Sequence, residues 1–256
     1  LGARLLYKSY ARLFCKLVQT GAYAITAHSN AAKRFLVAQG VPPEKVTVIP
    51  VGIDTGKFKK VDGPGLRNSF ATEPGPLLLT VARLHPNKGL EYLIRALRKA
   101  RAEIPGINLA IVGRGPLEKK LRDLTISLGL KEAIHFVSTG IPNEKMPAVY
   151  SASDIFVLPS VKEPFGRVLL EAMSCELPVI AARVAGPLEI VADGQTGFLV
   201  EPRSEEELVE KITWMVQHRI HAKDMGRNGR ERVKRYFDWN IVVKEYLKIY
   251  ESAIRR

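Results

Sequence analysis

The stretch EPFGRVLLEAMSCELP, residues 163–178, follows directly on DIFVL, residues 154–158, an apolar run that is typical of a buried strand. We predict a strand that ends at Pro159, a turn at Gly166 and a helix that begins near Arg167. Such a turn directs backbone N–H groups and the positive end of a helix dipole at one point. The stretch therefore predicts a site for an anion.

One acidic side chain in this predicted helix, Glu171, has apolar neighbours on both sides in the sequence. A buried carboxylate without hydrogen bonds is costly, so we expect other groups to bind it. Two interpretations are open. Either Glu171 points to solvent or pairs with a structural arginine, or Glu171 and Glu163 both accept hydrogen bonds from hydroxyl groups of a bound ligand.

Six short apolar runs alternate with predicted helices through the middle of the chain. The alternation predicts an α/β fold with a doubly wound parallel sheet, in which ligands bind beyond the carboxyl ends of the strands. The predicted strands are 77–81, 107–112, 133–137, 154–158, 178–181 and 197–200, and the helices between them are 90–103, 117–128, 144–152 and 167–175. From Ser204 onward the pattern is helical, with a last helix at about 241–254.

A shorter β-α-β pattern precedes this unit and predicts a truncated second α/β unit at the N-terminus. Its strands are expected at 23–27 and 46–49, with a helix between them that begins at Ser29 or Asn30. Gly and Pro residues are concentrated in 55–75, which indicates a linker. We therefore expect three parts: residues 1–75 with the linker, residues 76–235, and a C-terminal helix in 236–256 that packs back on the N-terminal unit.

Composition limits the class of protein. The 256 residues are 46% hydrophobic, which suffices for one large or two small globular domains. No apolar run of roughly 18 residues and no signal-peptide pattern occurs. Cys15 and Cys175 both lie in apolar helical patterns, so we expect free buried thiols and a reducing cytoplasm.

The net charge of +13 is largest in residues 1–75, which carry 11 basic and 4 acidic side chains. This favours an anionic partner such as phosphate, acidic lipid or nucleic acid. No zinc-ligand spacing, RNA-binding aromatic signature or helix-turn-helix pattern is present, so we expect no nucleic acid partner. Residues 4–19 combine a basic ridge with an apolar stripe and predict a helix that packs on its own domain or lies on an anionic membrane at its cytoplasmic face.

Two cations follow the strand predicted at 77–81, in the loop ARLHPNKG. Arg83 offers a planar fork and Lys88 a point charge, a combination that suits a diphosphate without a metal, although a solvated loop pair is the alternative. The later sequence Gly113-Arg-Gly115 resembles a dinucleotide fingerprint, but Glu118 occupies the position of its third small residue, so we expect no NAD. No Asp-x-Asp sequence marks a metal–diphosphate site, and we expect neither a metal nor a cofactor.

Five phrases, in this order, resemble a known family: VARLHPNKGLEYLIRAL, IVGRGPLEKKLRDL, MPAVYSASDIFVLPS, EPFGRVLLEAM and PVIAARVAGPLEIVADGQTGFLVEP. They are similar to the donor-binding domain of family 4 retaining glycosyltransferases, which have the two-domain GT-B fold. The resemblance covers residues 22 to about 250. It implies that Arg83 and Lys88 bind a nucleotide diphosphate and that Glu171 binds the ribose hydroxyls. It also implies that Glu163 accepts hydrogen bonds from the donor sugar, and we assign Glu163 to catalysis.

The resemblance implies backbone contacts as well. The backbone of Phe165, Gly166 and Arg167 would reach the sugar and the β-phosphate. The loop around Gly140 and Ile141 would offer backbone groups to the base. In such enzymes a proposed front-face mechanism lets the leaving phosphate take the acceptor proton.

Two positions and one loop depart from the pattern of the family that the chain resembles: Glu176 and Ala185 stand where glycine is usual, and the loop Ser138-Thr-Gly140 is one residue longer. The front of the acceptor domain is absent from these 256 residues, so we expect that a longer chain or a partner subunit supplies it. His85 is the histidine nearest to the predicted site in sequence.

We therefore predict a metal-independent hexosyltransferase that moves sugar from a UDP- or GDP-sugar, with retention, to an acceptor sugar or a lipid-linked glycan. One alternative is a donor-binding fragment or subunit without activity of its own. Another is a glycosidase that uses Glu163 and Glu171 as acid and nucleophile, which leaves Arg83 and Lys88 without a role.

Overall fold

The computed structural model describes residues 21–62 and 66–255. The basic helix predicted at 4–19 and Cys15 lie outside these ranges. The chain divides into two compact units, one made of Leu1–Gly52 with Trp239–Arg256 and the other of Ile53–Asp238. Across the described ranges, the helices are all too short or too polar to cross a membrane.

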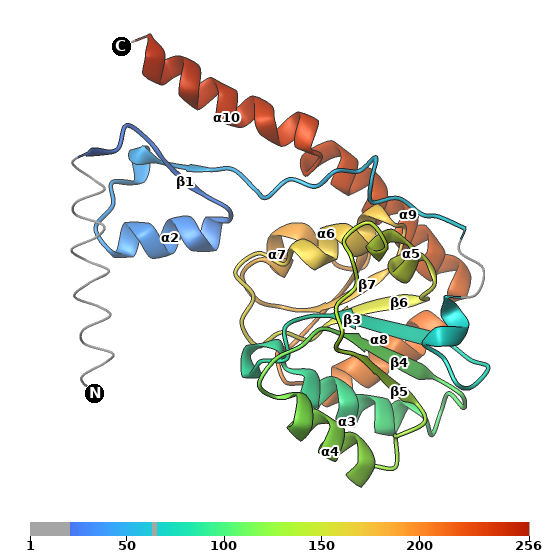
Figure 1. Ribbon diagram of the computed structural model, residues 1–256. Helices are drawn as coiled ribbons and strands as arrows, with labels where there is room; N and C mark the ends of the chain where they lie inside the picture. The colour runs from blue at the N-terminus through green and yellow to red at the C-terminus, as the bar shows by residue number, and fades with distance from the viewer. Residues whose placement is uncertain (1–20, 63–65, 256) are drawn as a thin grey trace, which may run out of the picture. The chain divides into compact units, whose positions relative to one another are not determined.

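The larger unit is built on a single six-stranded sheet in which every neighbouring pair of strands is parallel. The strand order is β5-β4-β3-β6-β7-β8 (Figure 1). The strands are β3 (Leu77–Val81), β4 (Asn108–Val112), β5 (Ile134–Val137), β6 (Ile155–Leu158), β7 (Val179–Ala182) and β8 (Gly197–Val200). The predicted doubly wound α/β fold is confirmed, and each strand lies within one residue of its predicted bounds.

Helices cover both faces of this sheet, with α3, α4 and α8 on one face and α5 and α6 on the other (Figure 1). In α3 the buried Leu90, Leu93, Ile94 and Leu97 recur at helical spacing and form one apolar face. The helices of this unit are α3 (Leu90–Ala100), α4 (Glu118–Ser127), α5 (Met146–Ser151), α6 (Arg167–Ser174), α7 (Pro187–Ile190), α8 (Glu205–Gln217) and α9 (Arg219–Tyr236).

The chain reverses its direction of travel across the sheet between β3 and β6. From β3 it continues to β4 and β5 on one side, and from β6 it continues to β7 and β8 on the other. The connections that leave the carboxyl ends of β3 and β6 therefore lead to opposite sides of the sheet. In open α/β sheets, ligands bind at such a switch point.

The division between the units falls at Gly52 and Ile53, not at the predicted position between residues 75 and 76. Residues 55–75 have the composition of a linker, but two aromatic side chains anchor their described part to the larger unit. Phe58 and Phe70 are 1% and 7% exposed, and the Ser174 hydroxyl donates to the Phe58 carbonyl at 2.6 Å. Burial of these two rings outweighs the local preference of Gly and Pro for an open linker.

The smaller unit contains β1 (Ile25–Ala27), α2 (Asn30–Ala38), β2 (Val46–Val48) and α10 (Trp239–Ile254), with β1 and β2 parallel. Ser29 caps α2, since its hydroxyl accepts a hydrogen bond from Ala32 N at 3.1 Å. The C-terminal helix α10 belongs to this unit, and the Tyr23 hydroxyl donates to the Ser252 carbonyl at 3.0 Å.

Candidate functional site

The loops after β3 and β6 lie against each other at the switch point of the larger unit. Gly89 ends the first loop with φ of 62°, and a Cβ atom there would lie 2.3 Å from the Pro159 carbonyl oxygen of the second. Only glycine fits this conformation at this distance. Beside it, Lys162 N donates to the Asn87 carbonyl at 3.1 Å. The two loops are therefore fixed side by side by backbone contacts.

This packing brings Lys88 of the first loop to Glu163 of the second. Lys88 Nζ lies 2.6 Å from Glu163 Oε2, and the Ser160 hydroxyl donates to the same oxygen at 3.1 Å. Glu163 is 8% exposed. The other carboxylate oxygen, Oε1, accepts no hydrogen bond from the residues that the structure describes. Glu163 thus combines a cation on one side with a vacant acceptor on the other.

The turn that follows Glu163 presents free backbone donors. Gly166 has φ of 99° and precedes the first residue of α6. Over residues 21–62 and 66–255, no acceptor pairs with the N–H groups of Phe165, Gly166 or Arg167. These donors lie at the positive end of the α6 dipole, which favours an anion. The structure therefore has the strand, turn and helix that the sequence predicted here.

The loop after β7, which contains Gly186, packs against this turn. Gly186 N donates to the Glu163 carbonyl at 3.0 Å. A Cβ atom on Gly186 would lie 2.0 Å from the Phe165 carbonyl oxygen, so the backbone of this loop touches the turn directly. Ala185, where the family pattern has glycine, does not take a positive φ. The backbone at this position therefore does not require glycine.

Glu171 lies one helical turn farther along α6, is 8% exposed, and has two partners. The Tyr150 hydroxyl donates to Glu171 Oε2 at 2.8 Å, and Arg167 Nε lies 3.3 Å from Oε1. Burial raises the pKa of Glu171, while the hydrogen bond from Tyr150 and the charge of Arg167 act against that rise. Burial, followed by the Glu171 charge, raises the pKa of Tyr150 well above its ordinary value. The pairing with an arginine agrees with the structural interpretation of Glu171.

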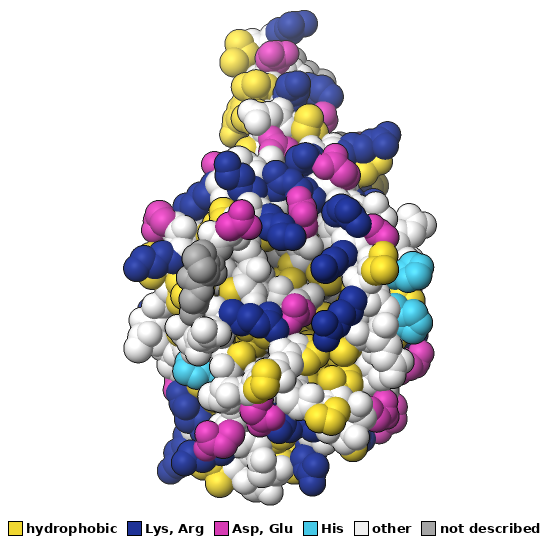
Figure 2. All heavy atoms as spheres, turned by 90° about the vertical axis from the view of Figure 1, so that its right-hand side faces the viewer, with side chains coloured by type: hydrophobic (Ala, Val, Ile, Leu, Met, Phe, Trp, Pro, Cys, Tyr) yellow, Lys and Arg dark blue, Asp and Glu magenta, His cyan; other side chains and the backbone are white. Residues whose placement is uncertain are grey.

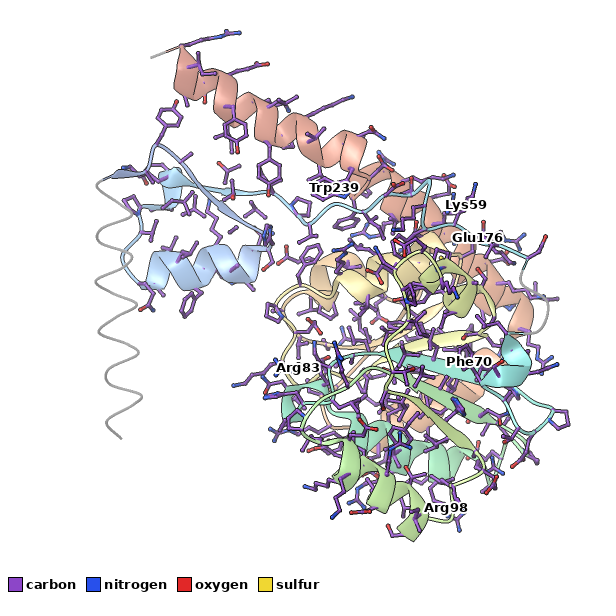
Figure 3. The ribbon with its side chains drawn as sticks, viewed as in Figure 1. Lys59, Phe70, Arg83, Arg98, Glu176 and Trp239 are labelled. Carbon is purple, nitrogen blue, oxygen red and sulfur yellow. The ribbon has the colours of Figure 1, made fainter. Side chains whose placement is uncertain are left out.

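Arg83 lies at the carboxyl edge of the sheet, and its exposed side chain makes no hydrogen bond or ion pair with the described part of the chain (Figure 3). The loop that carries it rests on the one after β4, since Leu84 N donates to the Arg114 carbonyl at 3.0 Å. A Cβ atom on Gly113 would lie 2.0 Å from the Ala82 oxygen, and one on Gly115 would lie 2.4 Å from the Leu84 oxygen. These glycines therefore serve loop packing, which accounts for the resemblance to a dinucleotide fingerprint.

The remaining predicted residues, Gly140, Ile141 and His85, make no recorded side-chain contact with the Lys88–Glu163 pair. Gly140 and Ile141 lie on the loop after β5, the edge strand, where Gly140 is exposed with φ of 81°. They make no contact with Lys88 or Glu163 that the structure records. The His85 ring accepts a hydrogen bond from Asn87 N at 3.4 Å and caps a short 3-10 turn, which is a structural role.

Glu176, the other departure from the family pattern, takes the backbone conformation of a glycine. Its φ is 60°, directly after the C-cap of α6. The chain cannot relax freely there, because a Cβ atom on Gly226 would lie 2.1 Å from the Glu176 carbonyl oxygen. The Glu176 carboxylate lies 3.9 Å from Arg230 Nε, at the long end of an ion pair.

Two partners of the site were missed from the sequence. Tyr150 could have been suspected, because a tyrosine in an apolar helix needs an acceptor for its hydroxyl. Nothing in the sequence singles out Ser160. Among the described residues, no three His, Cys, Asp or Glu side chains gather in a way that could hold a metal ion.

Comparison with known proteins identifies the family. Residues 66–232 match the family described as "Glycosyl transferases group 1", and residues 1–57 match "Glycosyltransferase Family 4". The chain is 31% identical over 239 residues to a GDP-mannose-dependent alpha-(1-6)-phosphatidylinositol monomannoside mannosyltransferase of Mycolicibacterium smegmatis. The aligned region covers 90% of this chain and 62% of the relative. It is 32% identical over 227 residues to an alpha-maltose-1-phosphate synthase of the same organism, over 82% of this chain and 58% of the relative.

Solved structures agree with this assignment. Anabaena HepE in complex with UDP-glucose matches 97% of this chain and 68% of its own, with a TM-score of 0.85 and 27% identity. Sucrose-phosphate synthase from Thermosynechococcus elongatus matches 94% of this chain and 60% of its own, with a TM-score of 0.83 and 29% identity. The chain thus spans about 60% of the length of these two curated relatives. It belongs to the family 4 glycosyltransferases, which have the GT-B fold.

Proposed function

We propose that this chain binds the donor, a nucleotide diphosphate sugar, and that the whole protein transfers its hexosyl group to an acceptor with retention of configuration. One observation carries the proposal. Within the described part of the chain, a cation, a carboxylate oxygen that accepts no hydrogen bond and three unpaired backbone N–H groups gather where the loops after β3 and β6 lie side by side. A diphosphate needs the cation and the N–H groups, and a sugar hydroxyl needs the carboxylate.

Lys88 can serve both parts of such a ligand. Its ammonium group has three N–H donors, of which one reaches Glu163 at 2.6 Å. The other two can point at phosphate oxygens without breaking that contact. Arg83, exposed and unpaired within the described ranges, adds a second cation from the same loop. We propose that these charges stabilise the departing diphosphate, which is the largest chemical demand of the transfer.

Glu163 and Glu171 have different tasks in this proposal. Glu163 Oε1 accepts a hydrogen bond from the donor sugar, while Lys88 and Ser160 hold Oε2. Glu171 binds the ribose hydroxyls, and Tyr150 fixes its position through Oε2. The backbone at Phe165 contacts the β-phosphate. Catalysis then rests on positioning and charge more than on a strong base.

The relatives support both donor classes, since one is named as GDP-mannose-dependent and HepE is described with UDP-glucose. We therefore keep UDP and GDP as the two candidate bases. An acceptor that is a sugar or a lipid-linked glycan fits the phosphatidylinositol monomannoside in the first relative's name. A second candidate is a donor-binding piece without activity of its own, which the coverage of about 60% of the relatives' length favours.

Calorimetry with UDP and GDP, with and without EDTA, tests the binding step and our proposal that it needs no metal. We expect one of the two nucleotides to bind, and EDTA to leave its affinity unchanged. Loss of affinity on chelation would refute metal independence, and no binding of either nucleotide would refute the function. Incubation with the sugar nucleotide and an acceptor then separates the candidates: product with retained configuration supports transfer, and binding without product supports the inactive piece.

A further inference from the structure

A cavity of about 500 Å³ opens on the larger unit at the edge where the strands begin. Pro76 precedes β3, Ile155 begins β6 and Pro178 precedes β7, and all three line it. The nucleotide site lies at the opposite edge, where the strands end. Figure 3 shows the two edges, with Arg83 at the carboxyl end of β3 and Phe70 toward the amino end. The cavity is therefore a separate site.

The walls of this cavity are largely apolar. Besides the residues at the strand ends, Met215 and Val216 of α8 and Ala222 of α9 line it. Its volume lies within the range of small-molecule sites, roughly 300–1,000 Å³. An apolar wall of this kind favours a ligand with a ring or a short hydrocarbon group.

The polar side chains around the cavity are mostly cationic. Arg67, Arg219 and Lys223 line it together with a single acidic residue, Asp154. Figure 2 looks onto this side of the molecule, and on the larger unit Lys and Arg side chains surround a hollowed area in which hydrophobic side chains show. Among these four residues, Arg67 and Asp154 form an ion pair with each other, whereas the structure records no ion pair for Arg219 or Lys223.

Arg67 and Asp154 satisfy each other. Arg67 Nη2 lies 2.7 Å from Asp154 Oδ2 and also donates to the Gly75 carbonyl at 2.7 Å. Leu77 N donates to the same Asp154 oxygen at 2.7 Å. The charge of Asp154 is therefore compensated by Arg67, and its carboxylate is held in place by hydrogen bonds. It does not neutralise the positive charge of Arg219 and Lys223.

The side chains of Arg219 and Lys223 are both exposed and make no hydrogen bond or ion pair with any residue that the structure describes. They lie four residues apart on α9, so they project from one face of the helix and repel each other. Arg219 is the first residue of α9, where the helix dipole disfavours a cation, and the first turn contains no acidic residue. A doubly negative group bound between them would remove both unfavourable effects.

We propose that this cavity binds a phosphate monoester that carries an apolar group, with the phosphate between Arg219 and Lys223 and the apolar group against Met215 and Val216. The charge of the phosphate matches the two free cations, and the apolar group matches the walls. The site is independent of the nucleotide site and does not rest on the proposed transfer reaction.

Calorimetry with 1-naphthyl phosphate tests the proposal, with 1-naphthol and inorganic phosphate as partial probes. We expect 1-naphthyl phosphate to bind more tightly than either, because each partial probe uses only one part of the site. The double variant Arg219→Ala/Lys223→Ala should weaken it by at least tenfold. Val216→Phe, which fills the cavity, should weaken 1-naphthyl phosphate while leaving inorganic phosphate unchanged.

The matched control is Lys119→Ala/Lys120→Ala, which removes the same charge from exposed positions in the first turn of α4. This control should bind 1-naphthyl phosphate as the wild type does, and neither double variant should melt at a lower temperature than the wild type. Saturating UDP or GDP should not displace the probe. The proposal is overturned if 1-naphthyl phosphate fails to bind at millimolar concentration, if the two double variants lose affinity equally, or if the nucleotide displaces the probe.

Discussion

Lys88 Nζ lies 2.6 Å from Glu163 Oε2, although 75 positions separate the two residues in the chain. Lys88 ends a 3-10 turn after the first strand of one half of the sheet, and Glu163 follows the first strand of the other half. The pair therefore spans the switch point. A ligand that binds one of these side chains changes the electrostatic environment of the other.

The first prediction separates the structural role of this pair from its role in binding. Lys88→Met should lower the free energy of unfolding by about 1–3 kcal/mol, because it leaves the Glu163 carboxylate buried without its cation. Adding Glu163→Gln should restore most of that stability, since the unpaired charge is then gone. Affinity for UDP or GDP should fall about 10- to 100-fold in both variants. Urea unfolding and calorimetry measure the two effects, and recovery of nucleotide affinity in the double variant would show that Lys88 does not bind phosphate.

The second prediction concerns Arg83, whose side chain has no partner among the described residues. Arg83→Ala should leave the melting temperature unchanged and weaken UDP or GDP about 10- to 100-fold. The free nucleoside should bind as before, because it lacks the diphosphate. Arg98→Ala is the matched control, an exposed arginine on α3 away from the carboxyl edge (Figure 3). An equal loss for nucleoside and nucleotide would contradict a phosphate contact.

Sequence reasoning predicted the elements of this site because each is encoded locally. The apolar run before Pro159, the glycine at 166 and the apolar helix after it fall within about 20 residues. Their periodicity is enough to predict a strand, a turn and a helix. The ends of parallel strands then meet at one edge of the sheet, which brings Arg83, Lys88 and Glu163 to the same region.

The contacts across the fold could not be predicted in the same way. Tyr150 reaches Glu171 from another helix, and no local pattern states which acceptor its hydroxyl finds. The residues after Gly52 look like a linker by composition, yet Phe58 is buried in the larger unit. Three-dimensional packing decides which acceptor a hydroxyl such as that of Tyr150 reaches and whether an isolated aromatic residue such as Phe58 is buried. Composition indicates only the local backbone preference of a segment.

The third prediction follows from the raised pKa of Glu171. A carboxyl group with a raised pKa in the folded state adds stability below its ordinary pKa of 4.5, and that stability is lost as pH rises through the folded pKa. The Tyr150 hydroxyl reduces this loss because it binds the ionised form. Tyr150→Phe should therefore cost about 1–3 kcal/mol at pH 8 and less at pH 4.5. Urea unfolding at both pH values measures this.

The matched control for this prediction is Tyr150→Phe in a Glu171→Gln background. The amide does not ionise, so the cost of losing the hydroxyl should then be the same at pH 4.5 and pH 8. If Tyr150→Phe in the wild-type background also costs the same at both values, the hydroxyl does not stabilise the ionised carboxylate. Its contribution would then be a neutral hydrogen bond and packing.

The fourth prediction concerns the φ of 60° at Glu176. Glycine adopts this conformation without the steric cost that a Cβ atom imposes, which is about 1 kcal/mol. Glu176→Gly should therefore raise the melting temperature by about 2–4 °C, despite the loss of the long ion pair to Arg230. Glu176→Ala is the control, because it removes the carboxylate and keeps the Cβ atom. Equal stabilisation by Ala and Gly would show that the carboxylate, not the backbone, carries the strain.

The fifth prediction tests whether the two buried glutamates contact different parts of one ligand. Glu171→Gln keeps the shape of the side chain but weakens its acceptance of ribose hydroxyls, so it should reduce affinity for UDP or GDP and for the whole sugar nucleotide alike. Glu163→Gln should reduce affinity for the sugar nucleotide while leaving UDP or GDP nearly unaffected, because the proposed sugar contact is through Oε1. Calorimetry with both ligands on both variants gives four affinities to compare.

The difference between these variants follows from position. Glu163 lies before the turn at Gly166, and Glu171 lies five residues beyond that turn on α6, where one helical turn takes about 3.6 residues. Melting temperatures provide the control, since Glu171→Gln removes an ionised group that burial disfavours and should not lower stability greatly. If both variants bind every ligand as the wild type does, the carboxylates hold only Lys88, Arg167 and Tyr150 in place. The anion site would then lack the sugar and ribose contacts on which the proposed function depends.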